Sequence, residues 1–82
     1  MTHAIYQIKN TVNGHVYVGS AVTLGKRWSR HRKDLERSKH DNRFLQNAWN
    51  KHGADAFEFS VLERVESADT LIAREQFWID RL

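Results

Sequence analysis

The alternation of hydrophobic and polar positions begins as a β-hairpin. Residues 4–9 and 15–19 are rich in Ile, Val and Tyr, and the Asn-Gly pair at 13–14 is a strong turn signal. A loop of two or four residues places Tyr6 and Tyr17 on the same face. The four-residue loop makes them diagonal neighbours, ~7–8 Å apart at the backbone. A shift of one residue would send them to opposite faces.

Two helices are expected after the hairpin. Thr23 is a suitable N-cap for a helix that runs to about Arg37, with apolar residues at helical spacing. Asp41 can cap a second helix, and Gly53 can end it as the C′ residue. The apolar residues are Leu24, Trp28 and Leu35 in the first helix, and Phe44, Leu45, Ala48 and Trp49 in the second.

The rest of the chain predicts one strand and one helix. Residues 57–65 begin with the apolar–polar alternation of a strand, and Ser67 can cap a last helix that runs to Leu82. The order is therefore ββααβα, without repeats, proline or an internal linker. We predict one α+β domain over residues 1–82, with helices packed on a small antiparallel sheet.

Composition and charge narrow the function. The 82 residues contain no cysteine, which excludes disulfides and thiolate metal sites, and no apolar run is long enough to span a bilayer. The net charge is +3, and eight Lys and Arg residues lie between Lys26 and Arg43. Such a stripe suits a polyanion, because phosphate contacts release condensed counterions. A solvated basic helix would show the same pattern.

Polar residues also occupy positions within two apolar stripes. Glu75 lies in the stripe that Leu71, Trp78 and Leu82 form, and His31 lies in the stripe of the first helix, four residues after Arg27. An unpaired buried carboxylate loses several kcal/mol of solvation, so Glu75 is either functional or paired at the edge of the stripe. A histidine in such a position is usually a hydrogen-bonded core residue.

These residues together resemble the GIY-YIG nuclease family. Ala4-Ile5-Tyr6 and Tyr17-Val18-Gly19, ten residues apart, match the signature that names the family, with Ala4 in place of its first glycine. The likeness spans the chain. It continues through Arg27 and His31, through His40, and through the segments 50–53 and 74–79. Family members usually carry a further Asn beyond the last helix.

The resemblance implies a three-stranded antiparallel sheet flanked by three helices, and hydrolysis of DNA phosphodiester bonds with one divalent ion, Mg²⁺ or Mn²⁺. It implies that Tyr6 and Tyr17 are active-site phenols, that Arg27 clamps the phosphate, and that Glu75 binds the metal. His31 and His40 would be polar participants. A single carboxylate suits Mg²⁺, which keeps several waters.

The motifs favour a homing endonuclease over the repair and restriction members of the same family. We therefore expect an excised catalytic domain, phage-encoded and cytoplasmic, that acts as a monomer on double-stranded DNA. Lys26, Arg30 and Lys33 are expected to contact the DNA backbone. Target specificity would come from a DNA-binding segment beyond Leu82.

The sequence leaves the general base open. A phenol with a pKa near 10 is only ~0.1% ionised at neutral pH, so Tyr6 as base needs up to ~4 kcal/mol of stabilisation. His31, with a pKa near neutrality, is the alternative, directly or through a tyrosine. We favour Tyr6, supported by Tyr17 and His31.

Two other functions compete with the nuclease. A domain that binds nucleic acid without chemistry would use the basic stripe equally well, with Glu75 in an internal ion pair. A protein-interaction module would use Phe77 and Trp78 as exposed aromatic residues.

Overall fold

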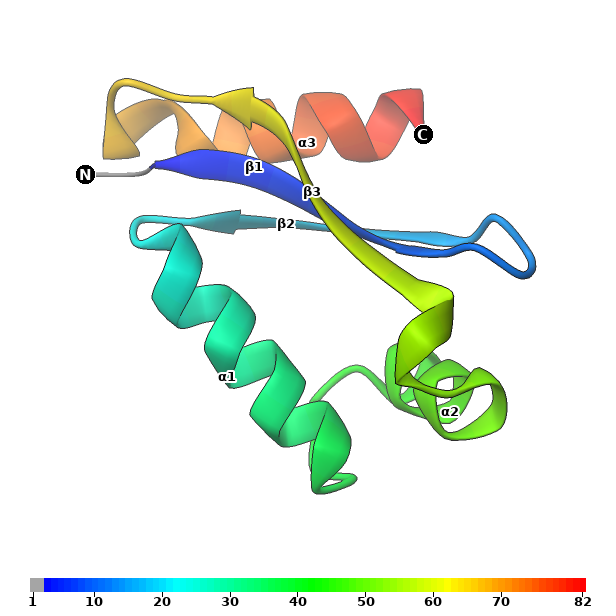
Figure 1. The fold of residues 1–82 in the computed structure, drawn as a ribbon. Helices are drawn as coiled ribbons and strands as arrows, with labels where there is room; N and C mark the ends of the chain where they lie inside the picture. Colours follow the sequence, from blue (N-terminus) through cyan, green and yellow to red (C-terminus); the bar gives the residue numbers. More distant parts are fainter. Residues whose placement is uncertain (1–2) are drawn as a thin grey trace.

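Three strands and three helices follow one another in the predicted order ββααβα (Figure 1). The computed structural model describes residues 3–82. The strands are β1 (Ala4–Asn10), β2 (Val16–Ala21) and β3 (Phe57–Arg64), and the helices are α1 (Leu24–Glu36), α2 (Arg43–His52) and α3 (Leu71–Arg81). Two short 3₁₀ turns, η1 (Ala54–Ala56) and η2 (Ala68–Thr70), precede β3 and α3.

The sheet is antiparallel, with β1 in the centre and the order β2-β1-β3. Tyr6 pairs with Gly19 and Ile8 pairs with Tyr17. The hairpin therefore has the four-residue loop, one of the two options that the sequence left open. Tyr6 and Tyr17 lie on one face, as predicted, and are diagonal neighbours. Gly14 has a φ of 79°, which the turn requires and glycine adopts without strain.

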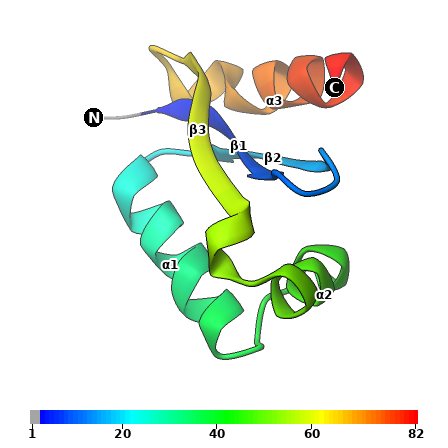
Figure 2. The same ribbon diagram turned by 45° about the vertical axis from the view of Figure 1, so that its right-hand side comes forward.

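The helices cover both faces of this sheet. α1 and α2 lie on one side and α3 lies on the other, where it packs mainly against β2 (Figures 1 and 2). The larger core fills the space between the sheet and α1 and α2. Its buried members include Tyr6, Ile8, Leu35, Leu45 and Phe57. Within residues 3–82, no helix has the length and apolar character that a membrane span requires.

The caps of the helices differ in part from the predictions. Thr23 is the N-cap of α1, although its side chain makes no capping hydrogen bond. The prediction of Asp41 as the cap of α2 is wrong. The helix begins later, and the Asn42 side chain accepts the hydrogen bond from the Leu45 amide at 3.0 Å. Ser67 caps η2 rather than α3.

The buried faces of α2 and α3 also differ from the apolar pattern. Phe44 was expected in the apolar stripe of α2 but is 89% exposed, whereas Gln46 is buried. Gln46 donates a hydrogen bond to the carbonyl of Leu35, and this contact turns its side of α2 toward α1. In α3 Leu71 is buried as predicted, but Leu82 is 62% exposed.

One glycine is required by packing. A Cβ atom on Gly19 would lie 2.5 Å from the hydroxyl oxygen of Tyr6 and 2.6 Å from the carbon that carries it. Tyr6 is only 1% exposed and belongs to the core, so its ring has no room to move. Ala4 needs no such freedom, because the positive-φ residues of the described chain are Ser38, Gly14 and Gly53.

We therefore predict that Gly19→Ala lowers the free energy of unfolding by ~1–3 kcal/mol, the usual cost of overpacking a core. Gly25→Ala is the matched control, because a Cβ there meets nothing within 4 Å and lies in α1, where alanine is the better helix former. Chemical denaturation of both variants measures the difference. Equal stabilities would contradict the close approach of Tyr6 to Gly19.

Candidate active site

A hydrogen bond between Tyr6 and His31 connects the central strand to α1. The phenol oxygen lies 2.5 Å from Nε2 of His31, and both side chains are buried. His31 therefore is a satisfied histidine in the core, as its place in the apolar stripe indicated. Its partner is also one of the two phenols that the sequence singled out.

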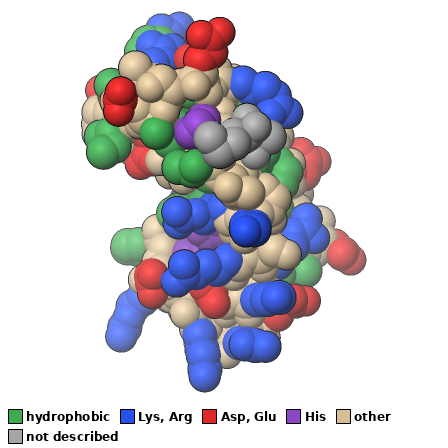
Figure 3. All heavy atoms as spheres, turned by 90° about the vertical axis from the view of Figure 1, so that its left-hand side faces the viewer, with side chains coloured by type: hydrophobic (Ala, Val, Ile, Leu, Met, Phe, Trp, Pro, Cys, Tyr) green, Lys and Arg blue, Asp and Glu red, His purple; other side chains and the backbone are tan. Residues whose placement is uncertain are grey.

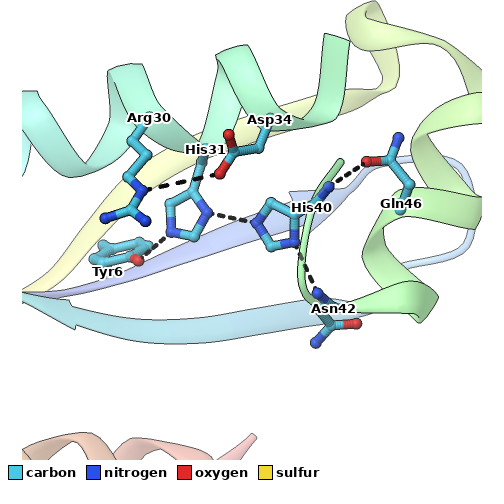
Figure 4. Close-up of polar contacts among 7 residues, drawn as sticks. All are labelled: Tyr6, Arg30, His31, Asp34, His40, Asn42 and Gln46. Carbon is cyan, nitrogen blue, oxygen red and sulfur yellow. Dashed lines mark hydrogen bonds and ion pairs between the residues drawn. The ribbon is translucent and has the colours of Figure 1, made fainter. Parts of the chain in front are cut away.

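His40 extends this contact toward the surface. Its Nε2 lies 2.7 Å from Nδ1 of His31, and the two rings stack with their centroids 4.9 Å apart. His40 lies on the segment between α1 and α2, where two hydrogen bonds hold it (Figure 4). Its backbone N–H donates to Oε1 of Gln46 at 3.0 Å, and its Nδ1 accepts from the backbone N–H of Asn42 at 3.0 Å.

Tyr17 packs against both histidines from β2. Its ring centroid lies 5.6 Å from that of His31 and 6.2 Å from that of His40, with the rings nearly perpendicular in each pair. Edge-to-face contacts of this kind fix the orientation of a ring. Tyr17 is half-buried, so part of its surface remains open to solvent.

A small hollow of about 160 Å³ opens beside these rings. Tyr17, Arg27, His31 and His40 line it, together with Arg30, Asp34, Asp41 and Asn42. Arg27 is exposed, and within residues 3–82 it forms no ion pair. Its guanidinium group is therefore available to an anion that enters the hollow.

Glu75 approaches the tyrosines from the other side of the sheet. It is half-buried on α3, so it is not an unpaired carboxylate in a dry core, and it does not line the hollow. Its charge nevertheless contributes to raising the pKa of both Tyr6 and Tyr17. Glu75 thus lies close enough to act on the phenols electrostatically.

The ion pair that joins α3 to β3 is formed by residues other than Glu75. Arg74 binds the carboxylate of Glu63 through two nitrogens, at 2.8 and 2.9 Å, and Trp78 Nε1 donates to the same carboxylate at 2.9 Å. Within residues 3–82, Glu75 forms no ion pair. Trp78 is half-buried in this contact, in line with its predicted place in the apolar stripe and not with the exposed Trp78 of the protein-interaction alternative. Phe77 lies against the guanidinium groups of Arg74 and Arg81.

Burial and nearby charges set the protonation states of the free domain. Burial raises the pKa of Tyr6 far above its ordinary value, with Tyr17 and Glu75 adding to the shift and Arg27 opposing it. Burial and then Glu75 raise the pKa of Tyr17. The pKa of His31 falls to about 4, because of burial first and then the charges of His40 and Arg27. At neutral pH the phenols are protonated and His31 is neutral.

The donor set matches a cation that brings most of its own ligands. Among residues 3–82 no three His, Cys, Asp or Glu side chains cluster as a metal cage would require. Glu75 offers one carboxylate that forms no ion pair within residues 3–82. A single protein ligand fits Mg²⁺, which retains several waters in its coordination shell.

Two supporting residues were not predicted. Gln46 and Asn42 hold His40, and Gln46 is a buried polar residue in an amphipathic helix. Gln46 lies outside the apolar stripe predicted for α2, so spacing offered no signal for it, unlike His31 and Glu75. Lys26, Arg30 and Lys33 lie together along the exposed side of α1, where they line a shallow groove.

Comparisons with known proteins show which family the chain belongs to. The GIY-YIG catalytic domain profile matches residues 2–82. Intron-associated endonuclease 1 of Enterobacteria phage T4 is 53% identical over the whole chain, which spans about a third (34%) of that relative's length.

Two solved structures share the fold. The match to the catalytic domain of homing endonuclease I-TevI includes 98% of this chain and 87% of that structure. The TM-score is 0.91 and the sequence identity is 52%. A variant of that domain with a glutamate replaced by alanine also gives 0.91 at 52% identity, covering 100% of this chain and covered to 84%. The expected resemblance and the expected fold are both confirmed, and the chain belongs to the GIY-YIG family of catalytic domains.

Proposed function

We propose that this chain is the catalytic domain of a homing endonuclease that hydrolyses DNA phosphodiester bonds with one divalent ion, Mg²⁺ or Mn²⁺. The observation that carries the proposal is a hollow lined by Tyr17, His31, His40 and Arg27, with the second phenol, Tyr6, hydrogen-bonded to His31. Within residues 3–82 neither Arg27 nor Glu75 forms an ion pair, and Glu75 acts electrostatically on both phenols. The names of the similar proteins support the same activity.

Arg27 is the proposed phosphate ligand. Its guanidinium group can donate two parallel hydrogen bonds to phosphate oxygens and stays charged throughout the reaction. The scissile phosphate would enter the hollow beside Arg27 and Tyr17. A neutral donor there would provide less stabilisation, because negative charge accumulates on the phosphoryl oxygens in the transition state.

The basic side of α1 would guide the DNA to this hollow. Figure 3 shows Lys and Arg side chains gathered on the half of the molecule where α1 lies. Lys26, Arg30 and Lys33 line the shallow groove, and Arg30 also lines the hollow, so the two surfaces are continuous. Contacts to phosphates position the duplex without reading its sequence. We therefore place target specificity outside residues 3–82.

Glu75 is the proposed metal ligand. A divalent ion bound there would neutralise charge that develops on the phosphate and assist the leaving oxygen. Glu75 is suited to this role because its carboxylate is half-buried, lacks an ion-pair partner among residues 3–82, and acts electrostatically on both tyrosines.

A tyrosine is the proposed general base. Tyr17 lines the hollow, and Tyr6 lies against the same histidine with its oxygen hydrogen-bonded. We assign the base to Tyr6, with Tyr17 and His31 in support. Burial, and after it the charges of Tyr17 and Glu75, raise the pKa of Tyr6 and oppose its ionisation, so Arg27 and a hydrogen-bond donor to the phenol must offset them.

The structure also bears on the alternative of DNA binding without chemistry. That alternative placed Glu75 in an internal ion pair, but the observed ion pair joins Glu63 of β3 to Arg74 of α3. The proposal accordingly remains a nuclease, which acts as a monomer on double-stranded DNA and is encoded by a phage and active in the cytoplasm of its host.

We predict that Arg27→Ala and Glu75→Ala each reduce Mg²⁺-dependent nicking of duplex DNA by ~10²–10³-fold, the usual loss when one transition-state stabiliser is removed. Both variants should keep the unfolding midpoint of the wild type, because neither side chain is buried. Glu66→Ala is the control, since Glu66 is exposed and remote from these contacts. Removal of the metal by a chelator should abolish nicking. Full nicking by Glu75→Ala would eliminate its role as ligand.

We further predict that Lys33→Ala weakens binding to duplexes of any sequence and reduces the slope of log K against log salt by ~1, because one phosphate contact is lost. Lys51→Ala, on the exposed side of α2, serves as the control and should keep the wild-type slope. Fluorescence anisotropy over a range of salt concentrations measures both. An equal slope for the two variants would show that the DNA does not lie along α1.

A further inference from the structure

The hydrogen bonds of His40 determine which of its nitrogens carries a proton. Its Nδ1 accepts from the backbone N–H of Asn42 at 3.0 Å. A backbone amide can only donate, so this nitrogen must present a lone pair. The ring proton of neutral His40 therefore sits on Nε2.

The position of the ring proton on His40 in turn determines the position of the ring proton on His31. Nε2 of His40 lies 2.7 Å from Nδ1 of His31, so the first donates and the second accepts. The ring proton of His31 must then sit on Nε2, which lies 2.5 Å from the oxygen of Tyr6. A cationic His31 would point a second N–H at the N–H of His40 and break their hydrogen bond. The low pKa of His31, about 4, agrees with a neutral ring.

We infer that the backbone amide of Asn42 sets the direction of this series of hydrogen bonds, so that His31 donates to the oxygen of Tyr6 (Figure 4). Gln46 is the positioning residue that holds His40 in the series. The catalytic consequence of this inference rests on the proposed function. In this arrangement His31 has no lone pair facing Tyr6 and does not act as its base. A donated N–H instead favours the ionised form of the phenol.

Gln46 is suited to its role by its complete set of contacts. It is buried on α2, and its Oε1 accepts the backbone N–H of His40 at 3.0 Å. Its Nε2 donates to the carbonyl of Leu35 at 2.9 Å and to Oδ1 of Asn50 at 3.0 Å. Gln46 therefore connects the end of α1, the segment that carries His40, and α2.

Asn42 is itself held in place. Its side chain caps α2 through the Leu45 amide, at 3.0 Å. The cap fixes the backbone of Asn42 while its own N–H points at His40. The N-cap residue of α2 thus also provides the first donor in the series of hydrogen bonds that leads to Tyr6.

Nitrogen NMR of the labelled domain, without DNA, tests the direction. Protonated and unprotonated ring nitrogens have distinct shifts, and we expect Nε2 to be protonated and Nδ1 unprotonated in both His31 and His40. A proton on Nδ1 of His31 would overturn the inference. Because this measurement involves no cleavage, it stands or fails separately from the nuclease assay.

Substitution of Gln46 tests the positioning role. In Gln46→Leu we expect His31 to populate both tautomers and its titration midpoint to rise. We also expect kcat to fall roughly tenfold with KM little changed, which is the effect of losing a residue that orients a functional histidine. Gln46→Glu keeps the oxygen that accepts from His40 and should retain the wild-type tautomers. Asn47→Leu, its exposed neighbour on α2, is the control.

Two outcomes would remove Gln46 from this role. One is a folded Gln46→Leu domain with wild-type tautomers and kcat. The other is a Gln46→Glu domain, folded and with its carboxylate ionised, in which His31 loses the Nε2–H tautomer although the acceptor is retained.

Discussion

The hydrogen bond between Tyr6 and His31 is the contact around which the rest of the domain is arranged. It joins the central strand to α1 between two buried side chains, and it satisfies two polar groups that would each cost ~1–3 kcal/mol if left unpaired. Gly19 is needed beside it because the phenol oxygen lies against its backbone. Core packing and the candidate chemistry therefore depend on the same atoms.

Local signals were sufficient to predict the hairpin and the order of the elements. The Asn-Gly turn and the alternation around it place Tyr6 and Tyr17 on one face, because a shift of one residue would expose the apolar side chains. The choice between the two- and four-residue loops, and with it the diagonal placement of the tyrosines, came from the structure. The cap of α2 at Asn42 and the exposure of Phe44 did not follow from local signals either, because the buried side of α2 carries Gln46, which is hydrogen-bonded to α1.

Three polar residues of the helices show how far spacing can predict a site. His31 and Glu75 have similar places in their helices, yet His31 is buried and hydrogen-bonded whereas Glu75 is half-buried without an ion pair in the described chain. Gln46, outside the predicted stripe of α2, is buried because α1 and the segment that carries His40 provide its partners. Periodicity identifies the anomaly, and only the fold supplies the partner.

The charges on the two sides of the sheet act on the phenols in opposite directions. Burial is the main cause that raises the pKa of Tyr6 and Tyr17; Glu75 adds to it, whereas Arg27 opposes it. In the free domain the protonated phenols therefore prevail. Any cation held by Glu75 offsets the carboxylate's charge and so favours ionisation of the phenols. A hydrogen bond from His31 to Tyr6 acts in the same direction and is built into the fold. Under the proposed mechanism, ionisation of the base is therefore coupled to occupancy of Glu75, which keeps the domain inactive until the site is filled.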